Sequence, residues 1–536
     1  MPIDEGVNTD LQFLVLEVKK QARASQSMVE KPTEKKLERI KVREDYVENL
    51  KNTLENKSYY NIHKTVKETR QMNYFRALIT ITSNLERCGD FFAHIGVQMT
   101  HVKRIKSFEP FILKRYYQVI YKALDLIYPA LTEHDLDLAN RICDYEQELD
   151  DYYDVSYELA RTKLKQGRNF EDMLTLMNIL RYLERAGDCF LNIGEAILDI
   201  HVGQKMGIRQ FRNLRRGLES QSIDIRADHV EFKPIMNTRS GCHVARITDK
   251  NAVDRPRSVF YKEGAKAKID EEVSGLKLWQ DKQPSRVPKI LWYDPRRQHS
   301  TILLEYIEGQ DMLDILISSK TKLHQALEIL TEGLTATWKA NIKKKRIETN
   351  FIDQLGHRWA DVSSVHDQLS EDFPNLKSAI ENASKIEEKL KSPFATLIHG
   401  DFNVDNIIFQ LKEEKMYYVD VRRSNFGDYV QDVSVFLISN LRVPIFSKDI
   451  RKRLNEANSR VFDCASKFAQ ENGDQLFEIR MAFGLVRSMI TSTRFLFDKK
   501  FSSDLIRRAI GILDDVNESG SDLKAFKINP NYFLYK

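Results

Sequence analysis

Apolar residues recur at helical spacing through most of the first two hundred residues of the chain. Two such segments, residues 74–101 and 172–201, run for about eight turns each without an internal proline. Each is preceded by two further helical segments. These four segments cover residues 11–24, 35–55, 111–130 and 135–165. The pattern predicts two three-helix units packed as one bundle.

The pattern changes after residue 201, where short β-branched or aromatic runs alternate with polar turns. Residues 243–248 and 257–262 are spaced like the strands of a hairpin, and residues 301–307 predict a further strand. Residues 264–281 have a helical pattern. From about residue 311 onward helices dominate, except around residues 396–421. We expect a small sheet-rich lobe joined to a larger helical lobe.

The predicted fold class is therefore multidomain, with an all-α duplicated three-helix bundle followed by an α+β bilobal domain. The expected boundaries are a bundle over residues 1–203, a linker over 204–231, a sheet-rich lobe over 232–309 and a helical lobe over 310–536. Five basic residues in the linker form either a solvated surface or a contact with an acidic partner or the bundle. They are Lys205, Arg209, Arg212, Arg215 and Arg216.

Composition narrows the classes of function. The chain has 536 residues, more than one hydrophobic core usually serves. Its 83 basic and 78 acidic residues leave a net charge of +5, which argues against nucleic acid as the main ligand. No run of 18 apolar residues occurs, and the N-terminal segment lacks a signal pattern. Five scattered cysteines fit reduced thiols. We expect a cytoplasmic protein that is not inserted in a membrane.

One string occurs twice in the bundle region. LERCGDFFAHIG begins at Leu85 and LERAGDCFLNIG begins at Leu183, 98 residues later, with eight of 12 positions identical. In each copy a glutamate and an aspartate stand four residues apart, on one helix face. Carboxylates of this kind either hold metal ions such as iron or manganese, or form a charged surface. The pairs are Glu86 with Asp90 and Glu184 with Asp188, with Glu146 and Asp150 as a third pair and Glu44 and Glu48 as its weaker counterpart.

The repeated L-E-R-x-G-D and I-G motifs resemble the PhoU family of phosphate-signalling proteins over roughly residues 10–203. The resemblance implies a six-helix bundle with metal-binding patches on the E-x-x-x-D pairs, holding iron, manganese or zinc. It also implies a regulator of phosphate transport that contacts a transporter component. A homodimer is a further option that the sequence leaves open.

The string HGDFNVDNIIF, at residues 399–409, carries the clearest chemistry. His399, Asp401 and Asn406 follow the order H-x-D-x-x-x-x-N, and Asp420 ends the next apolar run. Phosphoryl transfer needs a carboxylate at the acceptor hydroxyl, an amide on the metal ion, and a second carboxylate at metal and phosphates. We predict Asp401 as the base, His399 as a brace of the loop, and Asn406 and Asp420 as Mg²⁺ ligands.

This set resembles the aminoglycoside phosphotransferase and choline kinase superfamily, which has a protein-kinase-like fold, over about residues 232–515. The motif G-D-x-x-x-D matches Gly427, Asp428 and Asp432, acids that stabilise the catalytic loop in that family. The resemblance implies ATP and Mg²⁺ as cofactors. The residues implied for ATP are Lys262, its partner Glu271 or Glu272, Gly241 of the phosphate loop segment Thr238-Arg239-Ser240-Gly241, and Glu305 and Ile307 at adenine.

Two functions of different class remain open from the sequence. The first is an ATP-dependent phosphotransferase acting on a hydroxyl group of a small metabolite, with the bundle as its regulatory domain. The second is a non-catalytic regulator of phosphate transport that senses nucleotide and metal. Arg422 and Arg423 either favour an anionic acceptor or pair with Asp428 and Asp432. The acceptor itself is not readable, and Trp338 and Trp359 fit a helical core better than a cation-binding platform.

Overall fold

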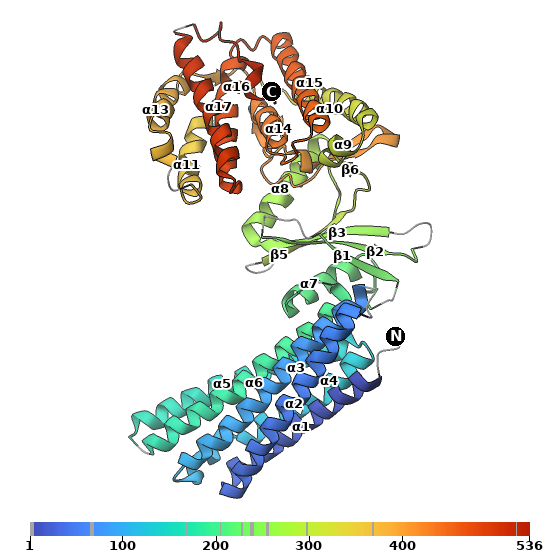
Figure 1. Cartoon of the computed structure of the whole chain (residues 1–536), viewed down its shortest axis with the longest axis vertical. Coiled ribbons are helices and arrows are strands. Elements are labelled where there is room, and N and C mark those ends of the chain that lie inside the picture. The colour runs from blue at the N-terminus through green and yellow to red at the C-terminus, as the bar shows by residue number, and fades with distance from the viewer. Residues whose placement is uncertain are drawn as a thin grey trace. The chain divides into compact units, whose positions relative to one another are not determined.

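The computed structural model divides into two compact units, Met1–Glu263 and Gly264–Lys536, which Figure 1 shows with their helices and strands. Each unit is described by itself below. The structure describes residues 5–64, 69–167, 169–203, 205–226, 229–235, 241–252, 257–295, 299–366, 369–520 and 522–535.

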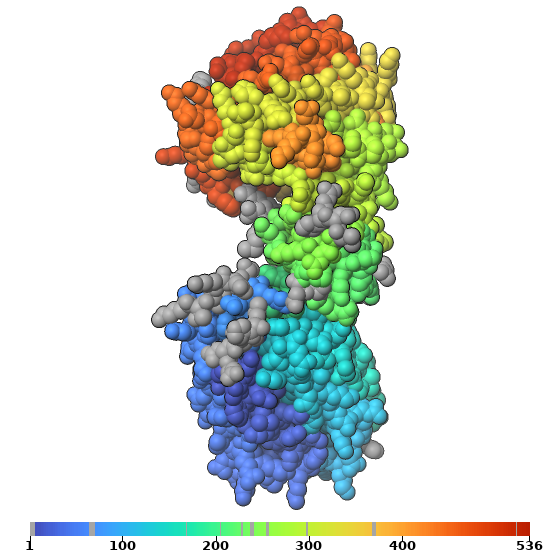
Figure 2. All heavy atoms as spheres, turned by 90° about the vertical axis from the view of Figure 1, so that its right-hand side faces the viewer, coloured from blue at the N-terminus to red at the C-terminus, as the bar shows by residue number. Residues whose placement is uncertain are grey.

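Six long helices form the main body of the first unit and run side by side (Figure 1). Side chains fill the spaces between them on the face shown in Figure 2. The helices are α1 (Glu5–Glu30), α2 (Glu34–Lys64), α3 (Thr69–Gln98), α4 (Leu113–Thr132), α5 (Leu136–Lys165) and α6 (Phe170–Val202). They confirm the predicted duplicated bundle, each helix falling on a segment with helical spacing.

The repeated glycines are explained by close helix packing. A Cβ added at Gly194 of α6 would lie 2.4 Å from Sγ of Cys143 on α5, and one at Gly96 of α3 would lie 3.0 Å from Cδ1 of Ile40 on α2. At Gly194 a larger residue would also meet the Ala139 backbone oxygen at 2.8 Å and push the paired helices apart, whereas at Gly96 the Ile40 side chain would have to shift. The I-G end of each repeat therefore fixes how its helix packs on the preceding one.

The segment expected as a linker is folded onto the bundle. It contains helix α7 (Ile208–Glu219), whose first N–H group, on Ile208, donates to the Glu195 carboxylate of α6 over 2.8 Å. Arg212 pairs with Asp144, and Arg215 pairs with Asp137 over 2.6 Å, so both arginines bind acids at or near the start of α5. Of the two readings of these basic residues, contact with the bundle is correct for this pair.

Three strands complete the first unit. They are β1 (Val230–Pro234), β2 (His243–Asp249) and β3 (Arg257–Ala265), in which the boundary between the units falls. β2 pairs antiparallel with both neighbours, with Phe232 opposite Ile247 and Tyr261 opposite Ala245. The hairpin expected over β2 and β3 is confirmed. β1 was missed because it is only five residues long and apolar residues alternate in it with exposed charged ones.

Helices dominate the second unit, as expected. They are α8 (Lys266–Lys282), α9 (Met312–Ser318), α10 (Lys320–Ala340), α11 (Phe351–Ser363), α12 (Leu369–Asp372), α13 (Leu376–Glu387), α14 (Val430–Leu441), α15 (Lys448–Glu471), α16 (Phe477–Ser492) and α17 (Lys499–Glu518). Trp338 of α10 is 1% exposed, and its ring packs at a tilt against that of Phe468 of α15, which confirms it as a core residue.

Short antiparallel pairs of strands lie between these helices. β4 pairs with β5, β10 lies between β11 and β6, β12 pairs with β9, and β7 pairs with β8. Their bounds are β4 (Ile290–Asp294), β5 (His299–Glu305), β6 (Gln310–Asp311), β7 (Ile347–Glu348), β8 (Lys391–Ser392), β9 (Thr396–Ile398), β10 (Ile407–Gln410), β11 (Lys415–Tyr418) and β12 (Asn425–Gly427). The expected strands over 301–307 and on either side of the turn after Phe409 are confirmed.

A buried ion network joins the start of α14 to the start of α16. Arg480 donates to Asp428 over 2.7 Å and to Asp474 over 2.7 Å, and the Tyr429 hydroxyl donates to Asp474. Removing one member of a buried ion network leaves another charged and unpaired, which typically costs about 3–5 kcal/mol. This network fixes the segment that follows β12.

In the part of the chain that the structure describes, no helix is both long and apolar enough to cross a membrane.

Candidate active site

The H-x-D loop leaves β9 and is held by the first turn of α14. The backbone N–H groups of His399 and Gly400 donate to Oδ2 and Oδ1 of Asp432 over 2.7 and 2.8 Å. Burial raises the pKa of Asp432 to about 7, and the two N–H donors oppose that rise. Both oxygens of this carboxylate are used to fix the loop backbone, the role implied for it by its place in G-D-x-x-x-D.

His399 is buried and braces the loop from within. Its Nε2 lies 3.0 Å from the carbonyl oxygen of Val419, and its Nδ1 lies 3.3 Å from the backbone nitrogen of Asp401. A neutral ring with its proton on Nε2 satisfies both contacts. Burial lowers the pKa of His399, which favours this neutral form. The imidazole therefore joins the loop to the segment that leads to Asp420.

The Asp401 carboxylate is oriented by two side chains. Asn403 Nδ2 donates to its Oδ1 over 2.8 Å, and Arg423 Nη1 lies 3.2 Å from its Oδ2. The Asn403 amide is itself oriented by a bond from Arg442 over 3.1 Å. A carboxylate positioned in this way can accept a proton from a hydroxyl group, provided that the bond to Arg423 yields.

Asn406 and Asp420 lie on adjoining segments. The Val419 N–H donates to the carbonyl oxygen of Asn406 over 3.1 Å, so the residue next to Asp420 is bonded to Asn406 itself. The Asn406 amide donates through Nδ2 to the Asp401 carbonyl over 2.9 Å, which leaves its oxygen as the ligand atom. Asp420 has φ +57°, a left-handed conformation that aspartate tolerates better than most residues. One amide oxygen and one carboxylate fit a Mg²⁺ ion that takes its other ligands from phosphates and water.

Helix α8 contacts the segment just after Asp420 without an intervening side chain. A Cβ added at Gly275 would lie 2.1 Å from the Val421 carbonyl oxygen, so only glycine fits there. Trp279 of the same helix donates to Ser424 Oγ over 2.8 Å, and Ser424 donates to the His399 carbonyl over 3.0 Å. α8 is thus bonded, through one hydroxyl, to the catalytic loop.

The residues implied for ATP lie on the expected elements. Lys262 is on β3 and is 8% exposed, and Glu272 is on α8 and is 2% exposed. Burial of both charged side chains is unusual without a binding role or a partner. Gly241 has φ +68°, as a turn requires. Thr238, Arg239 and Ser240 lie outside the described residues.

The segment expected to meet adenine follows β5. The Glu305 N–H donates to the Lys289 carbonyl oxygen over 2.9 Å, so this donor is already used within the β4–β5 pair. Any contact of Glu305 with adenine would therefore involve its carbonyl oxygen. Ile307 is buried. The contacts of both residues with adenine remain predictions.

The expected pairing of Arg422 and Arg423 with the acids of G-D-x-x-x-D is wrong. Asp428 pairs with Arg480, and Asp432 accepts backbone N–H groups. Arg423 instead pairs with Asp401, the predicted base, and Arg422 lies 4.0 Å from Glu271 of α8. The reason is that Asp428 is already bound by Arg480 of α16, which lies more than fifty residues further along the chain.

Sequence reasoning missed the arginines that α16 and its end bring to the site. Arg487 and Arg494 both interact electrostatically with Asp401 and Arg423. No motif marks them, because each stands singly in an amphipathic helical region. They are considered further below.

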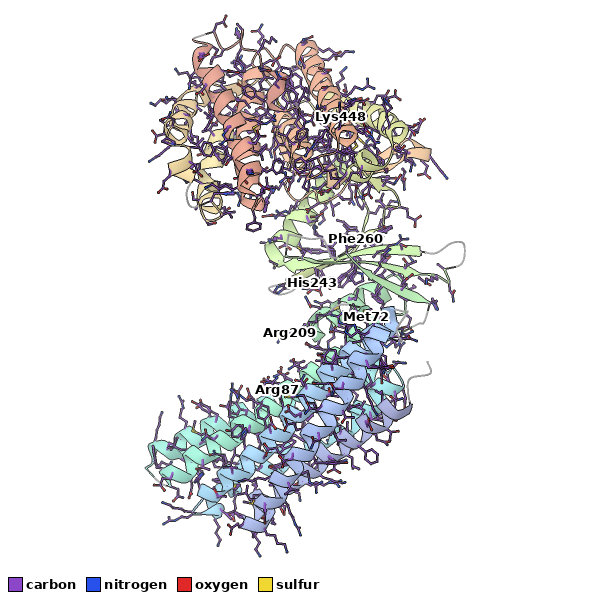
Figure 3. All side chains as sticks on the ribbon, viewed as in Figure 1. Met72, Arg87, Arg209, His243, Phe260 and Lys448 are labelled. Atoms are coloured by element: carbon purple, nitrogen blue, oxygen red, sulfur yellow. The ribbon has the colours of Figure 1, made fainter. Side chains whose placement is uncertain are left out.

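The carboxylate pairs of the bundle gather into two clusters of acids, one on each three-helix half. In the second half, burial and then Asp150 and Asp188 raise the pKa of Glu146. In the first half, burial and then Asp90 raise the pKa of Glu86. Arg87, labelled in Figure 3, is exposed on α3 beside this pair.

Two carboxylate oxygens of the second cluster, Asp150 Oδ1 and Glu184 Oε2, are screened from water and have no hydrogen-bond donor. Such orphaned acceptors favour a bound cation. Among the described residues, however, no group of three or more His, Cys, Asp or Glu side chains is placed so that it could hold a metal ion. The metal site on Glu86, Asp90, Glu184, Asp188, Glu146 and Asp150 is therefore not confirmed and stays a prediction.

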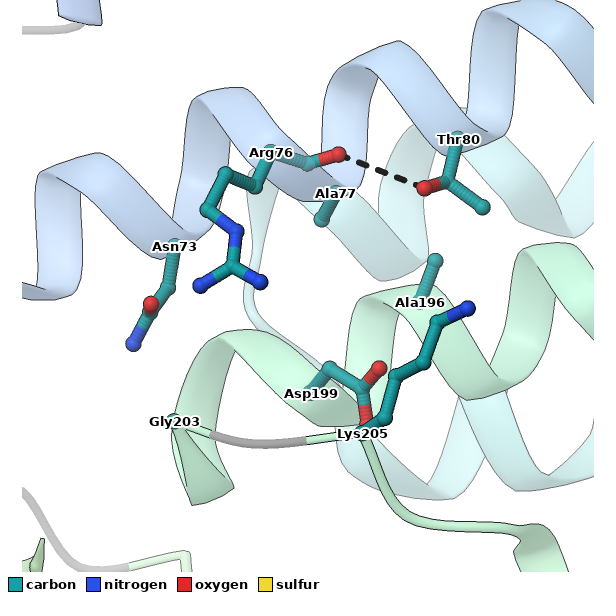
Figure 4. Close-up of a pocket in the computed structure, with 8 residues that line it drawn as sticks. All are labelled: Asn73, Arg76, Ala77, Thr80, Ala196, Asp199, Gly203 and Lys205. Atoms are coloured by element: carbon teal, nitrogen blue, oxygen red, sulfur yellow. Dashed lines mark hydrogen bonds between the residues drawn. The ribbon is translucent and has the colours of Figure 1, made fainter. Parts of the chain in front are cut away.

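A small pocket of about 80 Å³ lies between α3 and the end of α6 (Figure 4). Arg76, Asp199 and Lys205 are its charged lining residues. Burial raises the pKa of Asp199 to about 7, and the N–H donated by Met206 over 2.9 Å opposes this. No motif in the sequence marks this pocket.

Comparison with known proteins assigns each half of the chain. Residues 14–99 and 113–197 match the family described as PhoU domain, and residues 320–456 match the ecdysteroid kinase-like family. The chain carries a PhoU domain and a kinase-like domain. The PhoU domain is 27% identical over 183 residues to a phosphate-specific transport system accessory protein PhoU homolog of Thermotoga maritima, which is 33% of this chain and 76% of that protein.

Solved structures also resemble the two domains. PhoU from Pseudomonas aeruginosa has 17% identity, covers 37% of this chain and 97% of that structure, and gives a TM-score of 0.34. A thermostable mutant of aminoglycoside phosphotransferase APH(4)-Ia has 13% identity, covers 57% of this chain and 99% of that structure, and gives a TM-score of 0.38. The family matches confirm the PhoU domain recognised from the repeated motif and the kinase-like domain recognised from the H-x-D loop.

Proposed function

We propose that the protein transfers the γ-phosphate of ATP to a hydroxyl group of a small metabolite, with Mg²⁺ as cofactor, and that the PhoU domain links this activity to phosphate supply. The observation that carries the proposal is the bonded loop that holds Asp401, Asn406 and the segment of Asp420 together. These are the three groups that phosphoryl transfer requires. A kinase-like match in this part of the chain supports it.

In this proposal the oxygen of the acceptor hydroxyl attacks the γ-phosphorus of ATP. Asp401 accepts the proton that this hydroxyl loses. His399 and Asp432 hold the loop so that the carboxylate stays in place. Mg²⁺, when bound by Asn406 and Asp420, neutralises charge on the phosphates. Lys262 and Glu272 are assigned to the nucleotide, with Gly241, Glu305 and Ile307 at its phosphates and adenine.

The test is release of ADP from Mg·ATP by the full chain, in the presence of a panel of hydroxyl compounds. Asp401→Asn keeps the size of the side chain but removes the base, so we expect turnover to fall about 100- to 10,000-fold. Asp463→Asn, an exposed aspartate of α15, is the matched control. Equal turnover by Asp401→Asn and the parent protein, or no nucleotide binding at all, contradicts the proposal.

A second candidate is a regulator that binds nucleotide without turnover. The ion pair between Arg423 and Asp401 favours it, because the guanidinium already engages Oδ2 of the carboxylate that would have to meet the acceptor hydroxyl. In this alternative the PhoU domain senses phosphate or metal and contacts a phosphate-transporter component. Nucleotide-dependent binding to such a component, with no ADP formed on any acceptor, would favour this candidate over the enzyme.

A further inference from the structure

Two helical segments of the second unit bring arginines near the proposed base Asp401, and a third brings an arginine near one of these two. Arg487 lies on α16, Arg494 lies in the short 3₁₀ turn Thr493–Phe495, and Arg358 lies on α11. Asp401 and Arg423 act electrostatically on both Arg487 and Arg494, and Arg358 acts on Arg494. Together with Arg423, they form a cluster that we call the arginine cluster.

Packing fixes the place of this cluster. α11 packs against α16 and against the turn that holds Arg494. The Arg487 guanidinium lies 5.6 Å above the ring of Phe351, at the start of α11. On the other side, a Cβ added at Gly400 would lie 2.3 Å from the Arg423 carbonyl, so Arg423 is seated directly on the catalytic loop. The arginine cluster therefore belongs to the rigid frame of the site.

Arg487 is the member of the arginine cluster whose unpaired hydrogen-bond donors indicate a ligand. Its Nε and Nη2 are both screened from water and have no hydrogen-bond acceptor. Burial lowers the pKa of Arg487 to about 10, which shows how poorly the charge is compensated. Buried donors of a charged group are costly to leave unpaired, so an acceptor that the protein itself lacks is expected at this point.

The carboxylates around the arginine cluster do not neutralise its positive charge. Three carboxylates act on these arginines. They are Asp401, Asp432 and Asp361. Asp432 is engaged by two backbone N–H groups, and Asp361 lies 3.3 Å from Arg358. Arg487 and Arg494 are left with positive charge beside the base. A cationic acceptor would be repelled there, and a neutral one would leave the Arg487 donors unpaired.

We propose that the acceptor of the kinase-like domain is an anionic hydroxyl compound, a sugar or polyol bearing a phosphate ester or a carboxylate, whose oxyanion binds Arg487 beside Asp401. This rests on the proposed function and names its substrate class. Guanidinium groups bind phosphate and carboxylate through paired hydrogen bonds, so both oxyanions fit the same chemistry.

The transfer balances as follows. The acceptor hydroxyl oxygen forms a bond to the γ-phosphorus of ATP, the bond from that phosphorus to the β–γ bridging oxygen breaks, and ADP leaves with the electron pair. The hydroxyl proton passes to Asp401. Arg423 holds Oδ2 of Asp401 before the acceptor binds, and an incoming oxyanion would compete for its guanidinium and so release the base only when an acceptor is bound.

The binding test uses glucose 6-phosphate, gluconate and glucose with the full chain, with and without a non-hydrolysable ATP analogue and Mg²⁺. These probes share one carbon skeleton and differ in the phosphate, the carboxylate or the absence of charge. We expect one or both anions to bind more tightly than glucose, and Arg487→Met to weaken the binding about 10- to 100-fold. Arg507→Met, an exposed arginine of α17, should leave the binding unchanged.

Arg494→Met serves as a second variant, because its side chain is only half-buried and is less needed for folding. Equal binding of glucose and both anions, no binding of any anion, or anion binding that Arg487→Met and Arg494→Met leave intact, overturns the proposal. If ADP forms with neutral or cationic acceptors and Arg487→Met does not change it, the phosphotransferase function stands and the anionic acceptor is wrong. Absence of nucleotide binding would instead contradict the proposed function.

Discussion

Oδ1 of Asp432 accepts a hydrogen bond of 2.8 Å from the backbone N–H of Gly400, the glycine between the two catalytic-loop residues of H-x-D. Gly400 has φ +82°, a conformation that only glycine adopts readily, so its N–H direction is set by the backbone and not by a side chain. The carboxylate and the glycine are thus matched to one another. Their match fixes Asp401 one residue later.

Asp432→Asn should loosen this loop. The amide group places an N–H donor where one of the two backbone N–H groups needs an acceptor, so one charge-assisted bond is lost and a buried donor is left unpaired. We expect the free energy of unfolding to fall by about 2–3 kcal/mol, and turnover to fall with it. Urea unfolding and ADP release measure the two effects. Asp463→Asn should change neither, and an unaltered unfolding midpoint for Asp432→Asn would refute the anchoring role.

Arg423→Met tests whether the arginine restrains the base. Without the guanidinium 3.2 Å away, Oδ2 of Asp401 is free to take a proton from water, so hydrolysis of ATP without an acceptor should rise several-fold. ADP release in the absence of any acceptor is the measurement. Arg422→Met, whose guanidinium lies 4.0 Å from Glu271 instead, is the neighbouring control. A fall in hydrolysis would mean that Arg423 assists the reaction.

Asp199 should make the stability of the PhoU domain depend on pH. Its pKa is raised to about 7 in the folded protein, so between about pH 4 and 7 the unfolded chain has lost a proton that the folded chain keeps. The free energy of unfolding therefore falls as pH rises through this window, by at most about 4 kcal/mol, and is flat above it. Asp199→Asn should remove this fall and be more stable than the parent protein at pH 8.

Chemical unfolding at pH 5 and pH 8 compares Asp199→Asn with the parent protein. Asp154→Asn, an exposed aspartate of α5, should keep the parent's dependence on pH. A parallel loss of stability in the parent protein and Asp199→Asn would show that other groups are responsible.

The carboxylates of the second three-helix half predict metal binding. Glu184→Ala combined with Asp188→Ala removes one E-x-x-x-D pair, so the iron, manganese or zinc content of the purified protein should fall, as elemental analysis would show. Glu171→Ala, an exposed acid on the same helix that pairs with Lys103, should retain the metal. Equal metal content in all three proteins would identify these acids as plain charged surface.

The sequence predicts those helices and loops that are determined by residues close to one another in the chain. Helical spacing located the six helices of the PhoU domain, and the order of His399, Asp401 and Asn406 predicted one loop. Strand β1 and helix α7 were missed because contacts with residues far away in the sequence stabilise them. One such contact is the ion pair of Arg212, on α7, with Asp144. Arg423 was singled out from the sequence, but the other members of the arginine cluster were missed for the same reason, since long-range charge contacts leave no periodic pattern in a sequence.

The contact of Gly275 with Val421 couples the position of helix α8 to the position of the segment that carries Asp420. α8 carries Glu272 one turn before this glycine, and Val421 follows Asp420 directly. Since a carbonyl oxygen touches the helix backbone with no flexible side chain between them, a shift of α8 must carry the Asp420 segment with it. If Asp420 binds Mg²⁺ as proposed, a tilt of α8 would therefore also move this metal ligand.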